Sequence, residues 1–334
     1  MIDCIAIGEV MWDLTVELER EVQKLEPGNV IYCNIELHPG GAAANVASGI
    51  AVLGGSAVFV GKVGRDLFSQ LYIEDLEKRG VKVLRFIDEE AKAGFCVALA
   101  RPNVERMIFA FQGYKNELTT KEIEEAREII EDARFLYVSG FHMIRTRQAE
   151  AMMQAIDIAR ETETRILFDP ADCEYIKRNR AIVHRVIKKS DVLFVRDIDA
   201  MAITRSTNLR KAIDNLKHVL IYTRRNKIDE FPTIIIRRTE SRQSAAAQNE
   251  YILISAKGER KVSIESFKDR VRDTTGVDDA FSAALIYALS RGYELEKACR
   301  FAGWFAVEVS YRYGARSYPD RRSIEYAKKY FLER

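Results

Sequence analysis

The sequence lacks the features of several classes of protein. Its five cysteines are scattered and form neither a Cys-x-x-Cys pair nor a zinc pattern with histidines. Lys and Arg number 52 against 50 Asp and Glu, so a net charge of +2 does not favour nucleic acid. The apolar runs are too short to cross a bilayer, and the N-terminus has no basic signal-peptide segment. These absences predict a cytoplasmic protein with reduced cysteines, no resident metal and neither nucleic acid nor membrane as partner.

Short apolar runs alternate with longer amphipathic segments, as in a parallel sheet covered by helices. The runs are rich in β-branched residues and apolar almost throughout, which is typical of strands buried on both faces. A hydrophobic content of 47% is ample for a large core. We therefore predict a three-layer α/β/α, Rossmann-like core in a single domain, residues 1–334. The expected strands are 4–7, 57–60, 135–138, 166–168, 192–195 and 219–222, and the expected helices include 43–53, 67–79, 146–160, 279–290, 294–309 and 320–331.

Two segments, about 14–38 and 82–112, interrupt this alternation. The second contains the apolar runs 93–100 and 107–111, which predict a β-hairpin. We assign both segments to a small β-sheet lid, because an enzyme that transfers a reactive group must exclude water. The basic and then polar segment 224–250 has no assigned role.

The first candidate motif is Pro39-Gly40-Gly41-Ala42-Ala43-Ala44-Asn45. Paired glycines before a helix let the backbone approach a ligand, and the helix start offers free amides. The alternative is that small residues only let the helix pack closely on the sheet.

The second candidate motif is Asp273-Thr274-Thr275-Gly276-Val277-Asp278-Asp279, a turn that leads into a helix. The first amides of that helix would suit an incoming phosphoryl group. A carboxylate there could accept the proton of an attacking hydroxyl. The alternative is that Asp278 and Asp279 only stabilise the helix N-terminus.

In this order, the two motifs resemble those of the ribokinase-like or PfkB family of carbohydrate kinases. Further matches are the opening 7–13, which ends at Asp13, and the segments 61–66, 302–307 and 314–315. The resemblance covers nearly the whole chain. It implies transfer of the ATP γ-phosphate to a hydroxyl of a sugar or sugar acid, in the fructose, ketodeoxygluconate or ribose class. It also implies a lid that forms a homodimer contact.

The resemblance also implies a role for individual residues. Asp279 would be the general base, and the amides of Gly276, Val277 and Asp278 would form an anion hole. Asp13, Gly40, Gly41 and Asn45 would hold the sugar hydroxyls. Magnesium would arrive with ATP as MgATP. The expected nucleotide contacts are Arg196, Asp199, Thr223, Arg224, Arg225 and Thr274.

Three positions depart from the family pattern. Asp278 stands where the family has glycine, the family's Asn-x-x-Glu reads Arg196-Asp197-Ile198-Asp199, and its Thr-x-Gly-x-x-Gly reads Thr223-Arg224-Arg225-Asn226-Lys227. We favour compensation, in which Arg196, Arg224, Arg225 or Lys227 neutralises Asp278 and contacts phosphates directly. This leaves a working kinase, whose activity Asp278 in place of glycine would weaken. The alternative is an impaired kinase that binds a sugar or nucleoside as a sensor or regulatory partner. The sequence leaves the acceptor open.

Overall fold

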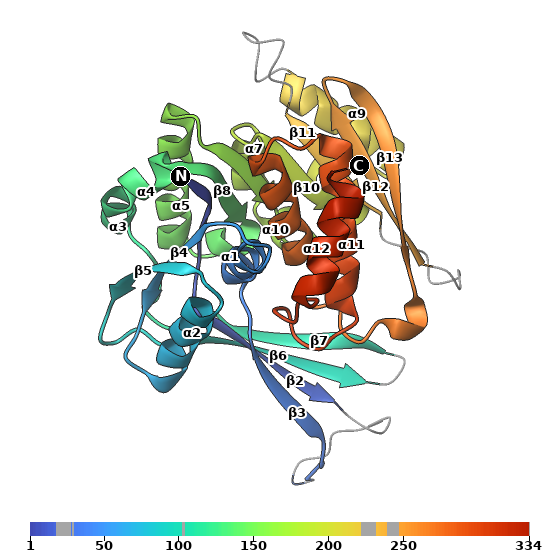
Figure 1. Ribbon diagram of the computed structural model, residues 1–334. Helices are drawn as coiled ribbons and strands as arrows, with labels where there is room; N and C mark the ends of the chain where they lie inside the picture. Colours follow the sequence, from blue (N-terminus) through green and yellow to red (C-terminus); the bar gives the residue numbers. More distant parts are fainter. Residues whose placement is uncertain (18–27, 29, 102–103, 222–231, 239–246, 334) are drawn as a thin grey trace.

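The computed structural model describes residues 1–17, 28, 30–101, 104–221, 232–238 and 247–333. Within them, nine strands form one sheet in the order β13-β12-β11-β10-β9-β8-β1-β4-β5 (Figure 1). Neighbours from β11 to β5 run parallel, whereas β12 and β13 pair antiparallel. The strands are β1 (Ile2–Ile7), β4 (Ala57–Val63), β5 (Lys82–Ile87), β8 (Ala133–Ser139), β9 (Arg165–Asp169), β10 (Val192–Arg196), β11 (Thr233–Arg237), β12 (Ala247–Ser255) and β13 (Gly258–Ser266).

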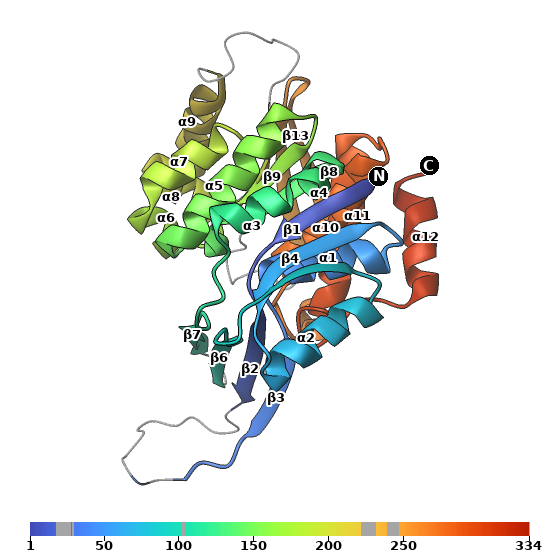
Figure 2. The same cartoon turned by 90° about the vertical axis from the view of Figure 1, so that its left-hand side faces the viewer.

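Helices cover both faces of this sheet (Figure 2). One face carries α1 (Ala42–Val52), α2 (Leu67–Lys78), α10 (Val277–Ser290), α11 (Leu295–Ser310) and α12 (Arg321–Phe331). The other carries α3 (Thr120–Glu125), α4 (Arg127–Glu131), α5 (Thr146–Glu161), α6 (Cys173–Arg178), α7 (Arg180–Ile187), α8 (Asp197–Thr204) and α9 (Leu209–Ile221). Short 3-10 helices are η1 (Gly140–Met143) and η3 (Lys268–Arg270). The predicted α/β/α layering is therefore confirmed.

The alternation of side chains along β1 shows how the sheet divides the core. Cys4 and Ala6 belong to the buried cluster under α1 and α10, and Ile5 and Ile7 belong to the cluster on the opposite face. Successive strand residues point to opposite faces, so a strand that is apolar throughout can be buried on both.

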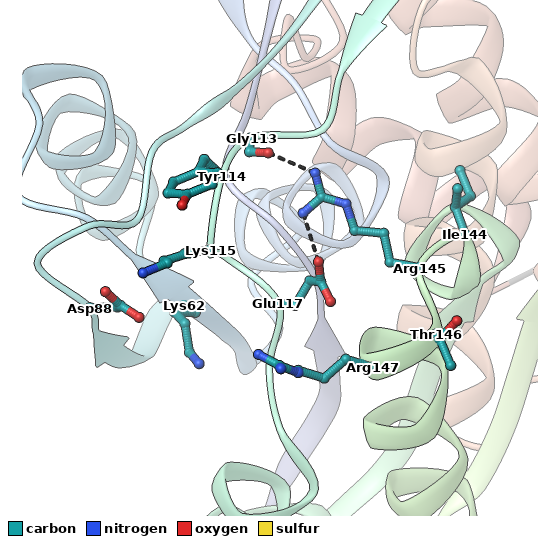
Figure 3. A pocket seen from close by; sticks show the side chains of 10 residues that line it. All are labelled: Lys62, Asp88, Gly113, Tyr114, Lys115, Glu117, Ile144, Arg145, Thr146 and Arg147. Atoms are coloured by element: carbon teal, nitrogen blue, oxygen red, sulfur yellow. Dashed lines mark hydrogen bonds and ion pairs between the residues drawn. The ribbon is translucent and has the colours of Figure 1, made fainter.

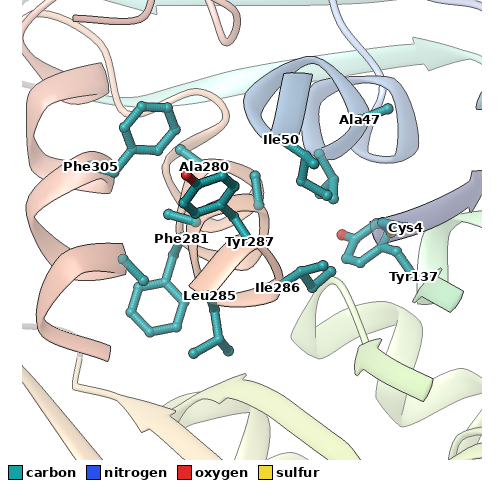
Figure 4. Close-up of a cluster of buried hydrophobic side chains, with 14 of the residues drawn as sticks. Cys4, Ala47, Ile50, Tyr137, Ala280, Phe281, Leu285, Ile286, Tyr287 and Phe305 are labelled. Atoms are coloured by element: carbon teal, nitrogen blue, oxygen red, sulfur yellow. The ribbon is translucent and has the colours of Figure 1, made fainter. Parts of the chain in front are cut away.

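Helix α10 is fixed tightly in the first cluster (Figure 4). The Phe281 ring stacks on Phe194 and Tyr251 with centroids 4.5 Å and 4.6 Å away. A Cβ at Gly49 of α1 would come 2.7 Å from the Cβ of Ala283, so only glycine allows this approach of the two helices. The packing holds the first turn of α10 beside the first turn of α1.

A second sheet of four strands, in the order β3-β2-β6-β7, forms the predicted lid. It lies at the carboxyl ends of the parallel strands (Figure 1). Its strands are β2 (Met11–Glu17), β3 (Asn34–Pro39), β6 (Gly94–Arg101) and β7 (Val104–Phe111), and β6 and β7 pair antiparallel as predicted. Residues 82–87, which we assigned to the lid, instead form edge strand β5 of the large sheet.

The predicted strand 219–222 is wrong. Val219 to Ile221 end helix α9, and residue 222 lies outside the described part of the chain. Buried Ala212, Ile213 and Leu216 have helical spacing, and the apolar run continues that helix. The strand beside β10 is β11, whose Ile-Ile-Ile core is fully buried.

Candidate active site

Asp279 lies in the first turn of α10 and contacts the first turn of α1. The Asn45 Nδ2 donates a hydrogen bond to its Oδ2 over 2.8 Å. The Asn45 Oδ1 in turn accepts from the Arg316 Nε over 2.9 Å. Because both ends of the amide are engaged, Asn45 is oriented as a donor to the aspartate. The structure thus brings two of the predicted site residues into direct contact.

Arg316, which the sequence analysis missed, is the centre of this arrangement. It is only 4% exposed, and its guanidinium lies 4.6 Å from the centroid of the Tyr72 ring. Its Nη2 donates to the Gly40 carbonyl over 2.6 Å, and its Nη1 donates to Asp75 over 2.7 Å. It therefore ties the paired-glycine turn to Asn45. The available signal was its place directly after the matched pair Gly314-Ala315.

The glycine turn lies against the lid. A Cβ on Gly40 would lie 2.1 Å from the Oδ2 of Asp13, which is on lid strand β2. Gly41 has a φ of 84° at the N-cap of α1, a conformation that favours glycine. The Tyr72 hydroxyl donates to the Gly40 carbonyl over 2.6 Å. Any larger residue at position 40 would displace the aspartate.

Two carboxyl groups of this site have raised pKa values. Burial raises the pKa of Asp279 to about 6, with a further increase from Asp278 and an opposing effect of the Asn45 hydrogen bond and Arg316. Burial also raises the pKa of Asp13 to about 6, helped by the charge of Asp279 and opposed by Arg316. A base whose pKa is near the working pH can take a proton and still be ionised in most molecules.

The turn before α10 has the geometry of an anion site. Gly276, the N-cap residue, has a φ of 75°, and a Cβ there would lie 2.5 Å from the Cβ of Ala315. Asp273 braces the turn, because its Oδ1 accepts from the Thr275 amide and its Oδ2 from the Gly314 amide. The Val277 amide donates to the Thr274 carbonyl at 3.4 Å, and the amides of the two aspartates that follow have no carbonyl partner within the helix.

Asp278, the residue that replaces the family's glycine, is paired with Arg237, an arginine of the basic segment 224–250 to which the sequence analysis gave no role. The Nη2 of Arg237 donates to its Oδ2 over 2.9 Å, and the Nε of Arg237 lies 2.7 Å from its Oδ1. Arg237 ends β11, the strand that the sequence analysis misplaced. Among the predicted compensating residues, Arg196 instead contacts Asp199 of α8, with Nε 2.6 Å from Oδ2. Thr223, Arg224, Arg225 and Lys227 lie outside the described residues.

A cavity of about 600 Å³ adjoins Asp278. Arg196, Arg237 and Thr274 line it together with Tyr251, Val277 and Val307. It combines two arginines, each paired with an aspartate, with apolar walls, which suits a ligand that carries both phosphates and a planar ring. Of the predicted nucleotide contacts, Arg196 and Thr274 line this cavity, whereas Asp199 is only 2% exposed and supports Arg196.

The described residues offer neither a resident metal site nor a membrane-spanning helix. In the described part of the chain, no group of three or more His, Cys, Asp and Glu side chains could hold a metal ion. Over the same residues, no helix combines the length and apolar character needed to cross a membrane.

The sheet, the lid and the aspartate at the helix start place the protein in a known class. The chain belongs to the pfkB family of carbohydrate kinases, whose sequence profile matches residues 1–321.

Its relatives include kinases for different acceptors. Adenosine kinase of Saccharomyces cerevisiae is 26% identical over 296 residues, 88% of this chain and 83% of that protein. A probable fructokinase of Arabidopsis thaliana is 26% identical over 290 residues, 83% of this chain and 78% of that protein. An E. coli structure, assigned as a ribokinase II and solved with ATP and Mg²⁺, has a TM-score of 0.80 and 18% identity, covering 99% of this chain and all of that one. That structure supports the fold.

Proposed function

We propose that this protein transfers the γ-phosphate of MgATP to a hydroxyl of a sugar or sugar-like small molecule. The observation that carries the proposal is the contact between Asp279 and Asn45, because it joins the helix-start motif to the paired-glycine motif. A base and a group that can bind hydroxyls are thereby adjacent. This is what phosphoryl transfer to an alcohol requires.

The acceptor would lie between the lid and the core. Asp13, Gly40, Gly41 and Asn45 would hold its hydroxyls, since carboxylate and amide groups can bridge neighbouring oxygens. Asp279 would take the proton of the attacking hydroxyl. The reaction forms an O–P bond to the acceptor, breaks the bond between the γ-phosphorus and the bridging oxygen, and releases ADP.

The amides of Gly276, Val277 and Asp278 would stabilise the charge of the transferred phosphoryl group. The nucleotide would occupy the cavity beside Asp278, with Arg196 and Thr274 in contact with it. Mg²⁺ would enter on ATP, where it neutralises phosphate charge, because this cation prefers to keep waters and phosphate oxygens as ligands.

The negative charge of Asp278 opposes phosphoryl transfer, and Arg237 offsets it. An unpaired carboxylate at position 278 would repel the phosphate by about 4 kcal/mol at 4 Å in a partly screened site. The Arg237 contacts neutralise that charge, and the side chains of the pair are only 19% and 31% exposed. Arginine at this place therefore supports compensation rather than loss of catalysis.

The acceptor belongs to the fructose, ketodeoxygluconate or ribose class in this proposal, and nucleosides form the nearest competing class. Titration of MgATP by calorimetry, followed by an ADP-release assay with sugars, sugar acids and nucleosides, tests both parts. Sugar-dependent ADP release supports the kinase. Binding of a sugar with neither nucleotide binding nor ADP release would instead support a sensor.

We further propose that the lid forms a homodimer contact. The strand register aligns Leu37, Leu14, Val97 and Phe109 in one row across all four strands. A second row aligns Ile35 with residues 16, 99 and 107. Residues paired across a ladder point to the same face, so the rows form one continuous apolar face. Ile35 is 59% and Phe109 is 56% exposed. A second copy would offer the same surface, as in a two-fold dimer.

Sedimentation of a charged variant tests the contact. Phe109→Asp should give a monomer, because a carboxylate buried at the interface has no partner. Ile108→Asp is the matched control, since it is equally exposed at 63% but points to the opposite face of β7. Monomers of the unaltered protein, or equal effects of both variants, would reject the lid as the contact.

A further inference from the structure

A second cavity, of about 880 Å³, lies where the lid joins the core (Figure 3). It is bounded by the end of β4, the loop 113–117 that leaves lid strand β7, and the first turn of α5. The residues of the proposed phosphoryl-transfer site do not line it. Its size is within the range of small-molecule sites.

Positive side chains dominate the lining. The cavity is lined by four cations and two carboxylates, namely Lys62, Lys115, Arg145, Arg147, Asp88 and Glu117. Figure 3 shows the ends of Arg147 and Lys62 pointing toward each other across the opening. Three of these cations are paired with carboxylates, whereas Arg147 has no carboxylate partner in the described part of the chain, and an unpaired guanidinium favours an anionic ligand.

The cations have different roles. Arg145 is structural, because it donates to Glu117 over 3.0 Å and to the Gly113 carbonyl over 2.7 Å. Lys62, whose side chain is 10% exposed, is 2.9 Å from Glu122, a residue outside the lining. Lys115 pairs with Glu90, also outside it. Among the described residues, Arg147 has no ion-pair partner, so its guanidinium is available to a ligand.

The N-terminus of α5 adds a second source of positive electrostatic potential beside Arg147. Thr146 and Arg147 are its first two residues and both line the cavity. No side chain caps the helix, and its first turn contains no acidic residue. Amides at the start of a 16-residue helix have no partner within it and carry partial positive charge. A phosphate beside Arg147 would accept hydrogen bonds from both sources.

Two residues of the loop 113–117 have a positive φ. Lys115 has a φ of 49°, in the left-handed region that non-glycine residues rarely adopt, and Gly113 has a φ of 81°. The Lys92 amide donates to the Tyr114 carbonyl over 2.8 Å, so this loop also joins the segments that enter β6 and leave β7. A ligand between Lys115 and α5 would therefore connect the base of the lid to the core.

We propose that this cavity binds the phosphate group of a small phosphorylated metabolite and that the bound ligand couples the lid to α5. Arg147 and the first amides of α5 hold the phosphate, and Lys62 and Lys115, which are paired with Glu122 and Glu90, line the rest of the site. The cavity leaves room for a sugar-sized remainder. Such a site would let a phosphorylated compound act on the lid without entering the kinase site.

Calorimetric titration with inorganic phosphate and with ribose 5-phosphate tests the proposal without any turnover. Arg147→Ala should weaken binding of both probes by about tenfold to a hundredfold, the worth of one charge-assisted hydrogen bond. Arg178→Ala, which alters an exposed arginine of α6 outside the cavity, is the matched control. Its binding should equal that of the unaltered protein.

Arg237→Met distinguishes this cavity from the kinase site. Phosphate at the second cavity should bind this variant as it binds the unaltered protein. Loss in Arg237→Met with no loss in Arg147→Ala would place the phosphate at the kinase site and overturn the proposal. Absence of binding at millimolar phosphate, or equal binding by all variants, would overturn it as well. Neither result would bear on sugar-dependent ADP release.

Discussion

The pair of Arg237 and Asp278 gives the sharpest prediction about catalysis. Replacing Arg237 by Met keeps an apolar stem and removes the charge that lies 2.7 Å from the carboxylate. The unpaired Asp278 would then repel the transferred phosphate. At about 4 Å and an effective dielectric constant of about 20, that repulsion is about 4 kcal/mol. A loss of this size corresponds to about a thousandfold in kcat/KM.

Removing the Asp278 carboxylate should restore the kcat/KM that is lost when Arg237 is replaced. In Arg237→Met/Asp278→Gly the unpaired charge is absent, so kcat/KM should recover by at least about a hundredfold over the single variant. Asp278→Gly alone should match or exceed the unaltered protein, since Arg237 can then contact phosphate directly. The assay is sugar-dependent ADP release, with folding monitored by circular dichroism.

Equal activity of the single and double variants would refute this reasoning. So would undiminished activity of Arg237→Met, because the carboxylate would then be harmless without its partner. A loss in Asp278→Gly would mean that the carboxylate has a positive role in the site. Recovery in the double variant excludes misfolding caused by the Arg237 substitution, and circular dichroism separates the other outcomes from misfolding.

Three further predictions concern the same site. The rate should fall as pH drops through about 6, because Asp279 must be ionised to act as base. Asp278→Gly should move this fall in rate to lower pH, because it removes a charge that raises the pKa of Asp279. Rates measured between about pH 5 and 8 test this. Gly40→Ala should raise the KM for the acceptor by about tenfold or more, with little change for ATP, because its Cβ would displace Asp13. Arg316→Met should lower the free energy of unfolding by about 1 to 3 kcal/mol in urea titrations, since the buried Asn45 Oδ1 loses its donor while Asp75 keeps only Arg79.

Local patterns predicted the layered fold and singled out the two motifs that the structure brings into contact. Asp279 and Asn45 each lie in a short motif with glycines directly before a helix, and the helix starts bring them together. A buried parallel strand such as β1 is apolar throughout, so it stands out from the amphipathic helices. The motifs and the apolar strands are defined by residues adjacent in sequence, so the sequence alone shows them.

Other features depend on contacts between distant segments. Arg316 is recognisable as a site residue only once Gly40, Asn45 and Asp75 surround it. Arg237 was missed because the apolar end of α9 was taken for the strand that β11 forms. Edge strand β5 was assigned to the lid because its burial is only partial along its length. Apolar periodicity alone does not distinguish such short runs.

The central claim is that Asp279 is the base of a sugar kinase, and sugar-dependent ADP release by Asp279→Asn tests it most directly. Asp3→Asn is the control, since this buried aspartate lies at the opposite end of β1, where it pairs with Arg291 at 3.2 Å. The account predicts at least about a hundredfold loss of rate for Asp279→Asn, as for loss of a general base, with acceptor binding retained and normal turnover by Asp3→Asn. Undiminished turnover by Asp279→Asn would contradict it.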